Sequence, residues 1–326
     1  MRLGLYLDLR NPPPWARPWA DVYGWTLELV AQAEAWGADS VWTTEHHFFE
    51  DGYLPQPLTL AAALAARTHR MRIGTAVVIA PLHPAVKIAE EAAVVDVLSG
   101  GRLDLGLGAG YRAAEFAAYD AELGPRNRTL DERVVAVRDW LAEGVTPPPV
   151  QEPVPMWIGH LGPKGARRAG RLGEGLLSLV PGTAEPYLAG LEDGGHDRAR
   201  ARVAGLVHVV VADDPEAAWA RIGPHIAYQL HSYARYALEG TEIPVPAAPT
   251  PQQVRAASEG AEHPGVFPSF VVLTPDDTVE LLAKLVTPGI PAEAFFFASI
   301  AGMPAELAER HVELLCRVVR PAVVEL

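Results

Sequence analysis

The sequence predicts an α/β protein in which eight parallel strands close into a (β/α)8 TIM barrel, with an insertion before the eighth strand. Short apolar runs rich in β-forming residues alternate with longer amphipathic runs, the pattern of a parallel sheet covered by crossover helices. Open doubly wound sheets have fewer strands and carry a glycine turn after the first one. Here residues 8–12 follow the first strand and include no glycine. Because such barrels routinely exceed about 250 residues, we expect a single domain covering 1–326.

The first half of the chain is expected to contain four strands and four helices. Gly37 ends the first helix, and the run from Ser99 to Arg102 ends the third, because glycine is favoured just beyond a helix C-terminus. The second helix is almost entirely alanine and leucine. The expected strands are 3–9, 40–44, 72–79 and 103–108, and the expected helices are 21–36, 57–68, 84–98 and 126–143.

The second half continues the alternation with one interruption. Asp214 and Pro215 begin a long helix, since proline is favoured in the first turn. Residues 241–270 are rich in proline and small residues and have no clear period, so they form either a surface loop or a lid. The expected strands are 155–159, 175–180, 203–211 and 294–298, and the expected helices begin near 163 and cover 214–238, 276–286 and 304–318.

Composition excludes several classes of function. The formal net charge of -13, without a run of lysine or arginine, argues against a nucleic-acid partner. No apolar run approaches the roughly 20 residues of a membrane span, and the first residues lack the pattern of a secretory signal. We therefore expect a cytoplasmic protein without a membrane partner. Cys316 is the only cysteine, so the chain has neither an internal disulfide nor a cysteine-built zinc site.

Polar residues after three strands are the candidates for chemistry, because active sites of these barrels lie at the carboxyl ends of the strands. The clusters are 45–47, 106–111 and 159–164. His46 and His47 are adjacent, so only one of them is expected to face the barrel mouth, where it would transfer protons. A metal site in which Glu45, His46 and His47 join His83 or His160 is the less favoured alternative; we expect none.

The other two clusters suggest a place for an anion or a flat ligand. Glycines 106, 108 and 110 permit close approach of a ligand to the backbone, although this spacing alone is weak evidence. Residues 159–164 lead into a helix, so free amides, a helix N-terminus and Lys164 converge where a phosphate would bind. The alternative to a phosphate site is an ordinary helix N-terminus with a lysine that is exposed to solvent.

Several segments together resemble the bacterial-luciferase-like family of flavin-dependent oxidoreductases, and the resemblance spans nearly the whole chain. The matching segments are 36–42 leading to 45–48, 72–77, 83–91, 98–111 and 170–175. Members are (β/α)8 barrels; many use reduced FMN, supplied by a separate flavin reductase, and O2 to oxygenate a small organic substrate. Others use the deazaflavin F420, and relatives are often homodimers that pack through the second and third helices.

The resemblance assigns roles to individual residues. It implies that His46 is catalytic, and that Ala76 and Val77 are joined by a non-proline cis peptide bond supporting the flavin ring. Glu45 is the second catalytic candidate and is expected either to orient His46 or to be structural. Family members often have arginine where this chain has Ala109, so Lys164, the nearby amides or Arg112 would bind the phosphate. The remaining cofactor-binding candidates are Tyr6, Thr75, Gly108, Gly110, Gly159, His160 and Gly162, and the substrate candidates are Trp42, Phe48, Tyr228, His231 and Phe297.

Three functions follow from these observations. The leading hypothesis is an FMN-dependent monooxygenase in which aromatic walls exclude water and His46 handles protons. The second is an F420-dependent oxidoreductase that transfers hydride, and the third is a flavin-binding protein without turnover. The substrate itself is not specified by any motif.

Overall fold

The computed structural model describes residues 1–324, and its strands form a closed parallel barrel. The third strand of the barrel is interrupted after Thr75, so its two parts, β3 and β4, both pair with β5 and close the ring. The strands are β1 (Arg2–Leu7), β2 (Ser40–Thr43), β3 (Arg72–Thr75), β4 (Val78–Ile79), β5 (Leu103–Gly108), β6 (Met156–Gly159), β7 (Gly175–Leu177), β8 (Val203–Val207) and β11 (Ala292–Phe297). The predicted eight-position barrel is thereby confirmed.

Helices surround the barrel, and most have the predicted bounds within a few residues. They are α1 (Trp19–Trp36), α2 (Pro57–Arg67), α3 (Ala85–Ser99), α5 (Arg126–Glu143), α6 (Pro163–Arg171), α8 (Pro215–Leu238), α10 (Pro275–Leu285) and α11 (Ala305–Leu314). The structure adds helices that periodicity did not predict, namely α4 (Ala113–Ala118), α7 (Ala184–Asp193), α9 (Pro251–Glu259) and α12 (Arg320–Val323). No helix within residues 1–324 is both long and apolar enough to cross a membrane.

The predicted strand 203–211 is divided in two. After β8 the chain leaves the barrel at His208, and β9 (Val209–Val211) pairs in parallel with β10 (Val271–Leu273) in a separate small sheet. The amide of His208 donates to the carbonyl of Gly265 at 2.8 Å, and its carbonyl accepts from Val271 N. These bonds draw the segment toward the insertion, which the β-branched sequence alone did not indicate.

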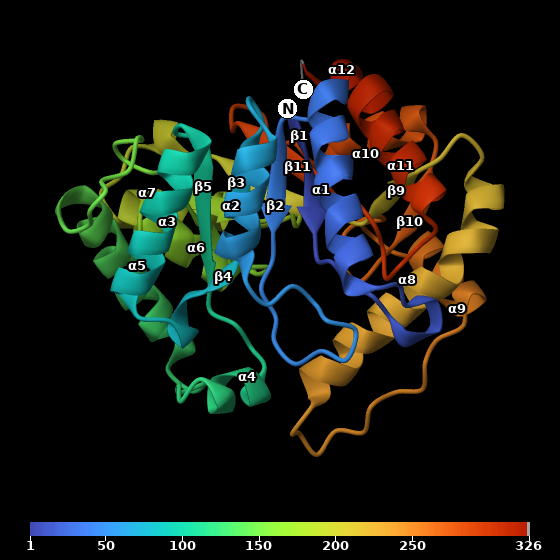
Figure 1. Cartoon of the computed structure of the whole chain (residues 1–326), viewed down its shortest axis with the longest axis horizontal. Helices are drawn as coiled ribbons and strands as arrows, with labels where there is room; N and C mark the ends of the chain where they lie inside the picture. Colours follow the sequence, from blue (N-terminus) through green and yellow to red (C-terminus); the bar gives the residue numbers. More distant parts are fainter. Residues whose placement is uncertain (325–326) are drawn as a thin grey trace.

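The two ends of the barrel differ in content. The N-terminus and α12 lie at the amino ends of the strands, and the connections that carry α4, α8 and α9 gather at the opposite, carboxyl end (Figure 1). The amino terminus donates to the carbonyl of Val323 at 3.0 Å. The carboxyl end is the end at which the three polar clusters lie.

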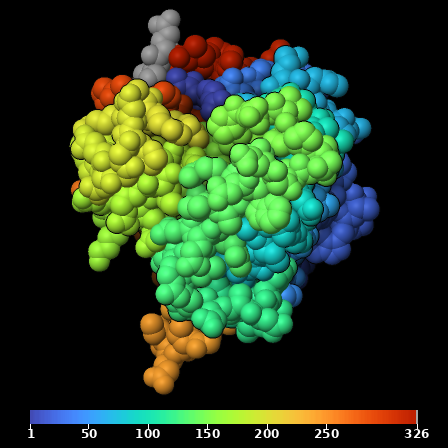
Figure 2. Space-filling model, turned by 90° about the vertical axis from the view of Figure 1, so that its left-hand side faces the viewer, coloured from blue at the N-terminus to red at the C-terminus, as the bar shows by residue number. Residues whose placement is uncertain are grey.

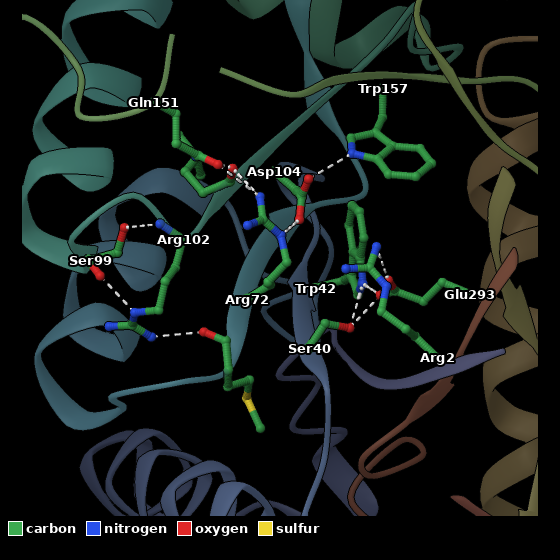
Figure 3. Close-up of polar contacts among 12 residues, drawn as sticks. Arg2, Ser40, Trp42, Arg72, Ser99, Arg102, Asp104, Gln151, Trp157 and Glu293 are labelled. Atoms are coloured by element: carbon green, nitrogen blue, oxygen red, sulfur yellow. Dashed lines mark hydrogen bonds and ion pairs between the residues drawn. The ribbon is translucent and has the colours of Figure 1, made fainter. Parts of the chain in front are cut away.

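A buried polar network fills the amino end. Glu293 of β11 accepts from the indole nitrogen of Trp42 at 2.6 Å, and Asp104 of β5 accepts from that of Trp157 at 3.0 Å (Figure 3). Burial raises the pKa of Glu293 above its ordinary value. The two carboxylates also pair with arginines, Arg2 and Arg72 respectively. These pairs satisfy charges that would otherwise be costly to bury.

The insertion before β11 is only partly irregular. Residues 241–250 have no regular structure, and orange residues from this part of the chain project from the body of the molecule (Figure 2). The next residues form α9, which begins with a capping box between Thr250 and Gln253 and buries Val254. The interval 241–270, predicted as a surface loop or a lid, therefore contains a helix that its lack of a clear period did not indicate.

Candidate active site

His46 and His47 lie at the carboxyl end of the barrel, and each is bound to a different carboxylate. His46 Nδ1 is 2.9 Å from Glu115 Oε1, and the same oxygen accepts from the backbone N–H of His47 at 2.9 Å. Glu115, on α4, is completely buried, whereas the His46 side chain keeps 12% of its surface exposed. With Nδ1 hydrogen-bonded to a carboxylate, Nε2 is the ring nitrogen left for proton exchange.

The carboxylate of Glu45 binds His47, His83 and the amide of Ile79, and it does not contact His46. Its Oε1 lies 2.8 Å from His47 Nε2 and 2.6 Å from His83 Nε2, and its Oε2 accepts from the amide of Ile79. Burial would raise the pKa of Glu45, but these hydrogen bonds hold it at about 2. Of the two roles expected for Glu45, orienting His46 is therefore corrected, because Glu115 makes that contact, and the structural role is the alternative that remains.

Glu45, His47 and His83 also form the one group in the described residues with ligand types and spacing suited to a metal. Their ligand atoms lie within 4.8 Å of one another, and all three residues are buried. Direct hydrogen bonds already join these atoms, and His47 Nδ1 lies 3.1 Å from the hydroxyl of Tyr119. The cluster is thus internally satisfied as a hydrogen-bonded group.

The interruption of the third strand forms the floor of the site. The Ala76–Val77 peptide bond is cis, as the resemblance implied. The amide of Ala76 donates to Thr43 O at 2.6 Å, and its carbonyl accepts from the hydroxyl of Tyr6 at 3.3 Å. Both Ala76 and Val77 are half-exposed, so this backbone borders the mouth.

Thr75 and the predicted glycines hold this floor in place. The Thr75 hydroxyl donates to Gly106 O and accepts from Gly106 N, both at 2.8 Å. A Cβ at Gly108 would collide with the Val77 side chain, and one at Gly159 would lie 2.7 Å from it. Because these glycines have no side chain, β5 and β6 can approach Val77. The glycines were predicted to make room for a ligand, and here they make room for a side chain of the protein.

Ala109, Gly110 and Arg112 follow β5 at the rim. Ala109 and Gly110 are half-buried, and Gly110 has a φ of +66°. Arg112 is buried, with its guanidinium paired with Glu239 and donating to His47 O. Because its guanidinium has these partners, the alternative in which Arg112 binds a phosphate is not favoured.

The N-terminus of α6 faces the same rim. Gly162 is its N-cap and supplies no side chain, so the first turn lacks a side-chain cap. Gly159 and His160 are half-exposed, while Lys164 is exposed in the first turn. His160 Nε2 is buried without a partner among the described residues, and burial lowers the pKa of this histidine to about 4. Free amides, an uncapped helix and a neutral imidazole are donors that fit a phosphate.

The predicted substrate residues are not all brought together. Trp42 is completely buried and belongs to the amino-end network, so its assignment to the pocket wall is corrected. Phe297 is buried, with its ring 5.0 Å from that of Tyr6, and Phe48 is 61% exposed on the loop after His47. Tyr228 and His231, on α8, are half-buried. Thus Phe297 lies beside Tyr6, Phe48 is exposed on its loop, and α8 reaches the mouth through Tyr233, whose hydroxyl lies 3.1 Å from that of Tyr53.

Several residues at the mouth were not predicted. Tyr53 is one of them, and it contacts the His46 ring together with Tyr111 of the predicted cluster 106–111, with centroid distances of 4.8 and 5.1 Å. Burial raises the pKa of Tyr111 to about 12, so this phenol remains protonated at neutral pH. The other residues that the sequence analysis missed are Glu115, Asp8, Arg10, Asp51 and Tyr233.

Comparison with known proteins gives partial matches to characterised oxidoreductases. The oxygenase component of a flavin-dependent trigonelline monooxygenase from Acinetobacter baylyi is 30% identical over 154 residues, which are 42% of this chain and 43% of that protein. An F420-dependent glucose-6-phosphate dehydrogenase from Amycolatopsis mediterranei is 33% identical over 176 residues, 46% of this chain and 52% of that protein. These matches cover about half the length of each relative.

The fold and the family are matched over a longer region. The crystal structure of monooxygenase RslO1 from Streptomyces bottropensis superposes with a TM-score of 0.81 at 23% identity and covers 98% of this chain and 99% of its own. This likeness shows the shared barrel. The sequence model of the luciferase-like monooxygenase family matches residues 1–292, which is most of the chain. The protein therefore belongs to the luciferase-like monooxygenase family, a family of oxidoreductases.

Proposed function

We propose that the protein is an FMN-dependent monooxygenase that uses reduced FMN and O2 to oxygenate a small organic substrate. The observation that carries the proposal is the pair of buried Glu115 and partly exposed His46, which follows β2, the strand whose Thr43 carbonyl accepts from the amide of Ala76. The pair can handle a proton, and the backbone of Ala76 and Val77 is a surface against which a flat ring can lie. The flavin-dependent monooxygenase among the relatives supports the same chemistry.

The residues present fit a flavin. Its ring would rest on Ala76 and Val77 beside Tyr6, and its phosphate would lie at the N-terminus of α6. There the buried, unpartnered His160 Nε2, the free amides after Gly162 and the exposed Lys164 are available donors. Since Ala109 supplies no charge, this anchor is weaker than one with an arginine, which suits a flavin that is exchanged between turnovers.

The chain's own contribution is proton handling and exclusion of water. When bound, reduced FMN supplies the electrons with which one atom of O2 enters the substrate. Glu115 fixes Nδ1 of His46 and leaves Nε2 to donate or accept a proton at the reacting centre. The rings of Phe49, Tyr53 and Tyr111 surround His46 at 4.8 to 5.1 Å and limit access of water.

A separate flavin reductase is proposed as the source of reduced FMN, on the model of the relative described as an oxygenase component. We also propose that the protein acts in the cytoplasm as a homodimer. Apolar side chains on the outside of α3, namely Val94, Val97 and Leu98, are 41 to 55% exposed and support a contact between copies through this helix. Residues 241–250 are proposed as a lid over the mouth.

Hydride transfer with F420 is the second candidate, supported by the F420-dependent relative. A flavin-binding protein without turnover is the remaining one. Anaerobic titration of the protein with reduced FMN and with reduced F420 separates the first two. We expect reduced FMN to bind at least about tenfold more tightly, a difference of about 1.4 kcal/mol. Tighter binding of F420 would overturn the proposal, and reduced FMN that is reoxidised by O2 at the same rate free and bound would favour a protein without turnover.

A further inference from the structure

An open pocket lies at the amino end of the barrel, opposite the proposed flavin site. Its volume is about 670 Å³. Three strands border it with their first residues, namely Arg2 of β1, Val203 of β8 and Ala292 of β11. Pockets that bind small molecules usually measure about 300 to 1,000 Å³. The pocket therefore has room for an organic molecule, and the proposed reaction does not use it.

Arginine is the main charged residue of the pocket lining. Four arginines line it together with two carboxylates, whereas acidic residues outnumber basic ones by 40 to 27 in the whole chain. The excess of positive charge is thus a property of this pocket and not of the chain in general. Such a pocket attracts anions. The arginines are Arg2, Arg200, Arg202 and Arg320, and the carboxylates are Asp39 and Glu293.

Two of these arginines are paired with the two carboxylates. Arg320 Nη2 lies 2.9 Å from Asp39 Oδ1. Arg2 Nη2 lies 2.7 Å from Glu293 Oε2, and the two side chains point toward each other (Figure 3). Because the charges within each pair compensate each other, the uncompensated positive charge of the pocket comes from the other two arginines.

Arg200 and Arg202 lie just before β8, and both keep donors for a ligand. Arg200 is exposed, and its guanidinium has neither a hydrogen bond nor an ion pair within residues 1–324. The Arg202 side chain is 30% exposed; its Nη2 donates to Met156 O at 2.8 Å and lies 3.8 Å from Glu174 Oε2. Glu174 is closer to Arg138, at 2.5 Å, so it compensates the charge of Arg202 only in part.

These two guanidiniums favour a phosphate group as the ligand. Two uncompensated positive charges match a dianion, and a phosphate monoester carries nearly two negative charges at neutral pH because its second pKa is about 6. A guanidinium also binds phosphate oxygens through two parallel hydrogen bonds. The pocket is larger than a phosphate ion needs, and the rest of its lining includes the aliphatic side chains of Ala199, Ala201, Val203, Ile290 and Pro291. An organic body attached to the phosphate would contact these side chains.

We propose that the amino-end pocket binds a small organic phosphate, with Arg200 and Arg202 donating to the phosphate oxygens. The pocket and His46 lie at opposite ends of the barrel, so this ligand is neither the substrate nor the flavin of the proposed reaction. The proposal goes beyond the monooxygenase function and does not depend on which cofactor the carboxyl end binds.

Isothermal titration calorimetry of the full chain without flavin tests the proposal. Three probes share one ring system and are used at about pH 7.5, above the second phosphate pKa: 1-naphthyl phosphate is a dianion, 1-naphthalenesulfonate is a monoanion, and 1-naphthol is neutral. We expect 1-naphthyl phosphate to bind about tenfold more tightly than the sulfonate, the scale of one additional charged hydrogen bond, and 1-naphthol to bind most weakly. Equal binding of the phosphate and the sulfonate, or tightest binding of 1-naphthol, would overturn the proposal.

Variants locate the binding within the protein. Arg200→Gln should raise the Kd of 1-naphthyl phosphate about five- to tenfold and Arg202→Gln about tenfold or more, with 1-naphthol unchanged. Arg310→Gln is the matched control, because Arg310 is a surface arginine paired with Asp213. Arg202 also lies over the Trp157 ring, 4.9 Å from its centroid, so if Arg202→Gln does not fold, the exposed Arg200 decides.

The flavin phosphate anchor is the other place at which a phosphate could bind, and Lys164→Ala distinguishes it from the amino-end pocket. We expect this variant to bind 1-naphthyl phosphate as the unmodified chain does. An unchanged Kd in folded Arg200→Gln, or a larger increase in Lys164→Ala than in Arg200→Gln, contradicts the assignment. Since no flavin is present in these titrations, their failure is distinct from failure of the reduced-FMN titration.

Discussion

His46 Nδ1 and Glu115 Oε1 lie 2.9 Å apart, joining the end of β2 to the short helix after β5. The same carboxylate oxygen receives the backbone N–H of His47, so one buried group fixes both the ring and the turn that presents it. Nδ1 is thereby kept as the bound nitrogen and Nε2 as the one directed to chemistry. This relationship makes Glu115 a positioning residue for the proposed reaction.

Replacing Glu115 by Gln should impair the reaction of bound reduced FMN with O2 while leaving binding of reduced FMN nearly unchanged. The amide cannot hold Nδ1–H in the same way, so the proton-handling nitrogen of His46 is no longer defined. We expect at least a tenfold change in the rate of flavin reoxidation, and about 100-fold for His46→Ala, the scale of general acid and base catalysis. Stopped-flow absorbance of the flavin measures both.

Two control variants distinguish a loss of His46 positioning from a general loss of folding. Glu91→Gln removes an exposed carboxylate that pairs with Lys87 and should have no effect. Glu115→Asp keeps the charge and should recover part of the rate, which a purely structural role would not produce. An unchanged reoxidation rate in folded Glu115→Gln contradicts the assigned role.

The position of Glu115 shows where sequence reasoning ends. The ends of most strands could be predicted, and with them the clusters at 45–47, 106–111 and 159–164, because alternating apolar and amphipathic runs fix strand ends to within a few residues. Glu115 instead lies in α4, a helix of six residues that is too short to show a period. Its approach to His46 depends on how the loop after β5 folds back over β2.

The sequence could have pointed to Arg10 by its position, but not to its partners. Asp8 and Arg10 directly follow β1, so the rule that identified the other clusters also applies to them. The rule cannot reveal their partners, because Ser232 is 222 residues away on α8. The rule also cannot tell toward which end of the barrel a side chain extends. Trp42 is close to the end of β2 in sequence, yet its indole nitrogen donates to Glu293 in the amino-end network.

The stability of the protein should depend on pH through Asp8. Burial raises the pKa of Asp8 from 3.8 to about 7, although Arg10 opposes the shift. The folded state thus holds a proton that the unfolded chain has released, so this stabilising contribution is complete below the unfolded pKa and is lost as pH rises through about 7. Asp8→Asn removes the loss, and its advantage in unfolding free energy over the unmodified chain should increase between about pH 5 and about pH 8 by about 2 to 3 kcal/mol.

Urea unfolding followed by circular dichroism at these two pH values measures this change. Asp213→Asn, at the surface, should leave the pH dependence nearly as it is. A variant Asp8→Asn whose advantage is the same at both pH values would show that Asp8 does not release a proton in this range.

Leu98 tests the proposed contact between two copies. It is 55% exposed on α3 beside Val94 and Val97, which are 44% and 41% exposed. A glutamate at this position would bury an unpaired charge in a dimer interface, which is strongly unfavourable. We expect Leu98→Glu to be monomeric by light scattering and the unmodified chain to be dimeric. Val318→Glu, which replaces another apolar side chain that is 45% exposed, should remain dimeric; a dimeric Leu98→Glu would exclude this face as the interface.

Lys164 tests the proposed phosphate anchor. It is exposed in the first turn of α6, which has no side-chain cap, so it would contact only the phosphate end of the flavin. Lys164→Ala should raise the Kd of reduced FMN about five- to tenfold, the scale of one solvent-accessible charged contact. Riboflavin has the same ring without the phosphate, and its Kd should not change. Lys87→Ala, which removes an exposed lysine on α3, is the matched control. Equal losses for FMN and riboflavin would mean that Lys164 acts on the ring or on the fold, and no loss for either would leave the amides after Gly162 and the imidazole of His160 as the phosphate ligands.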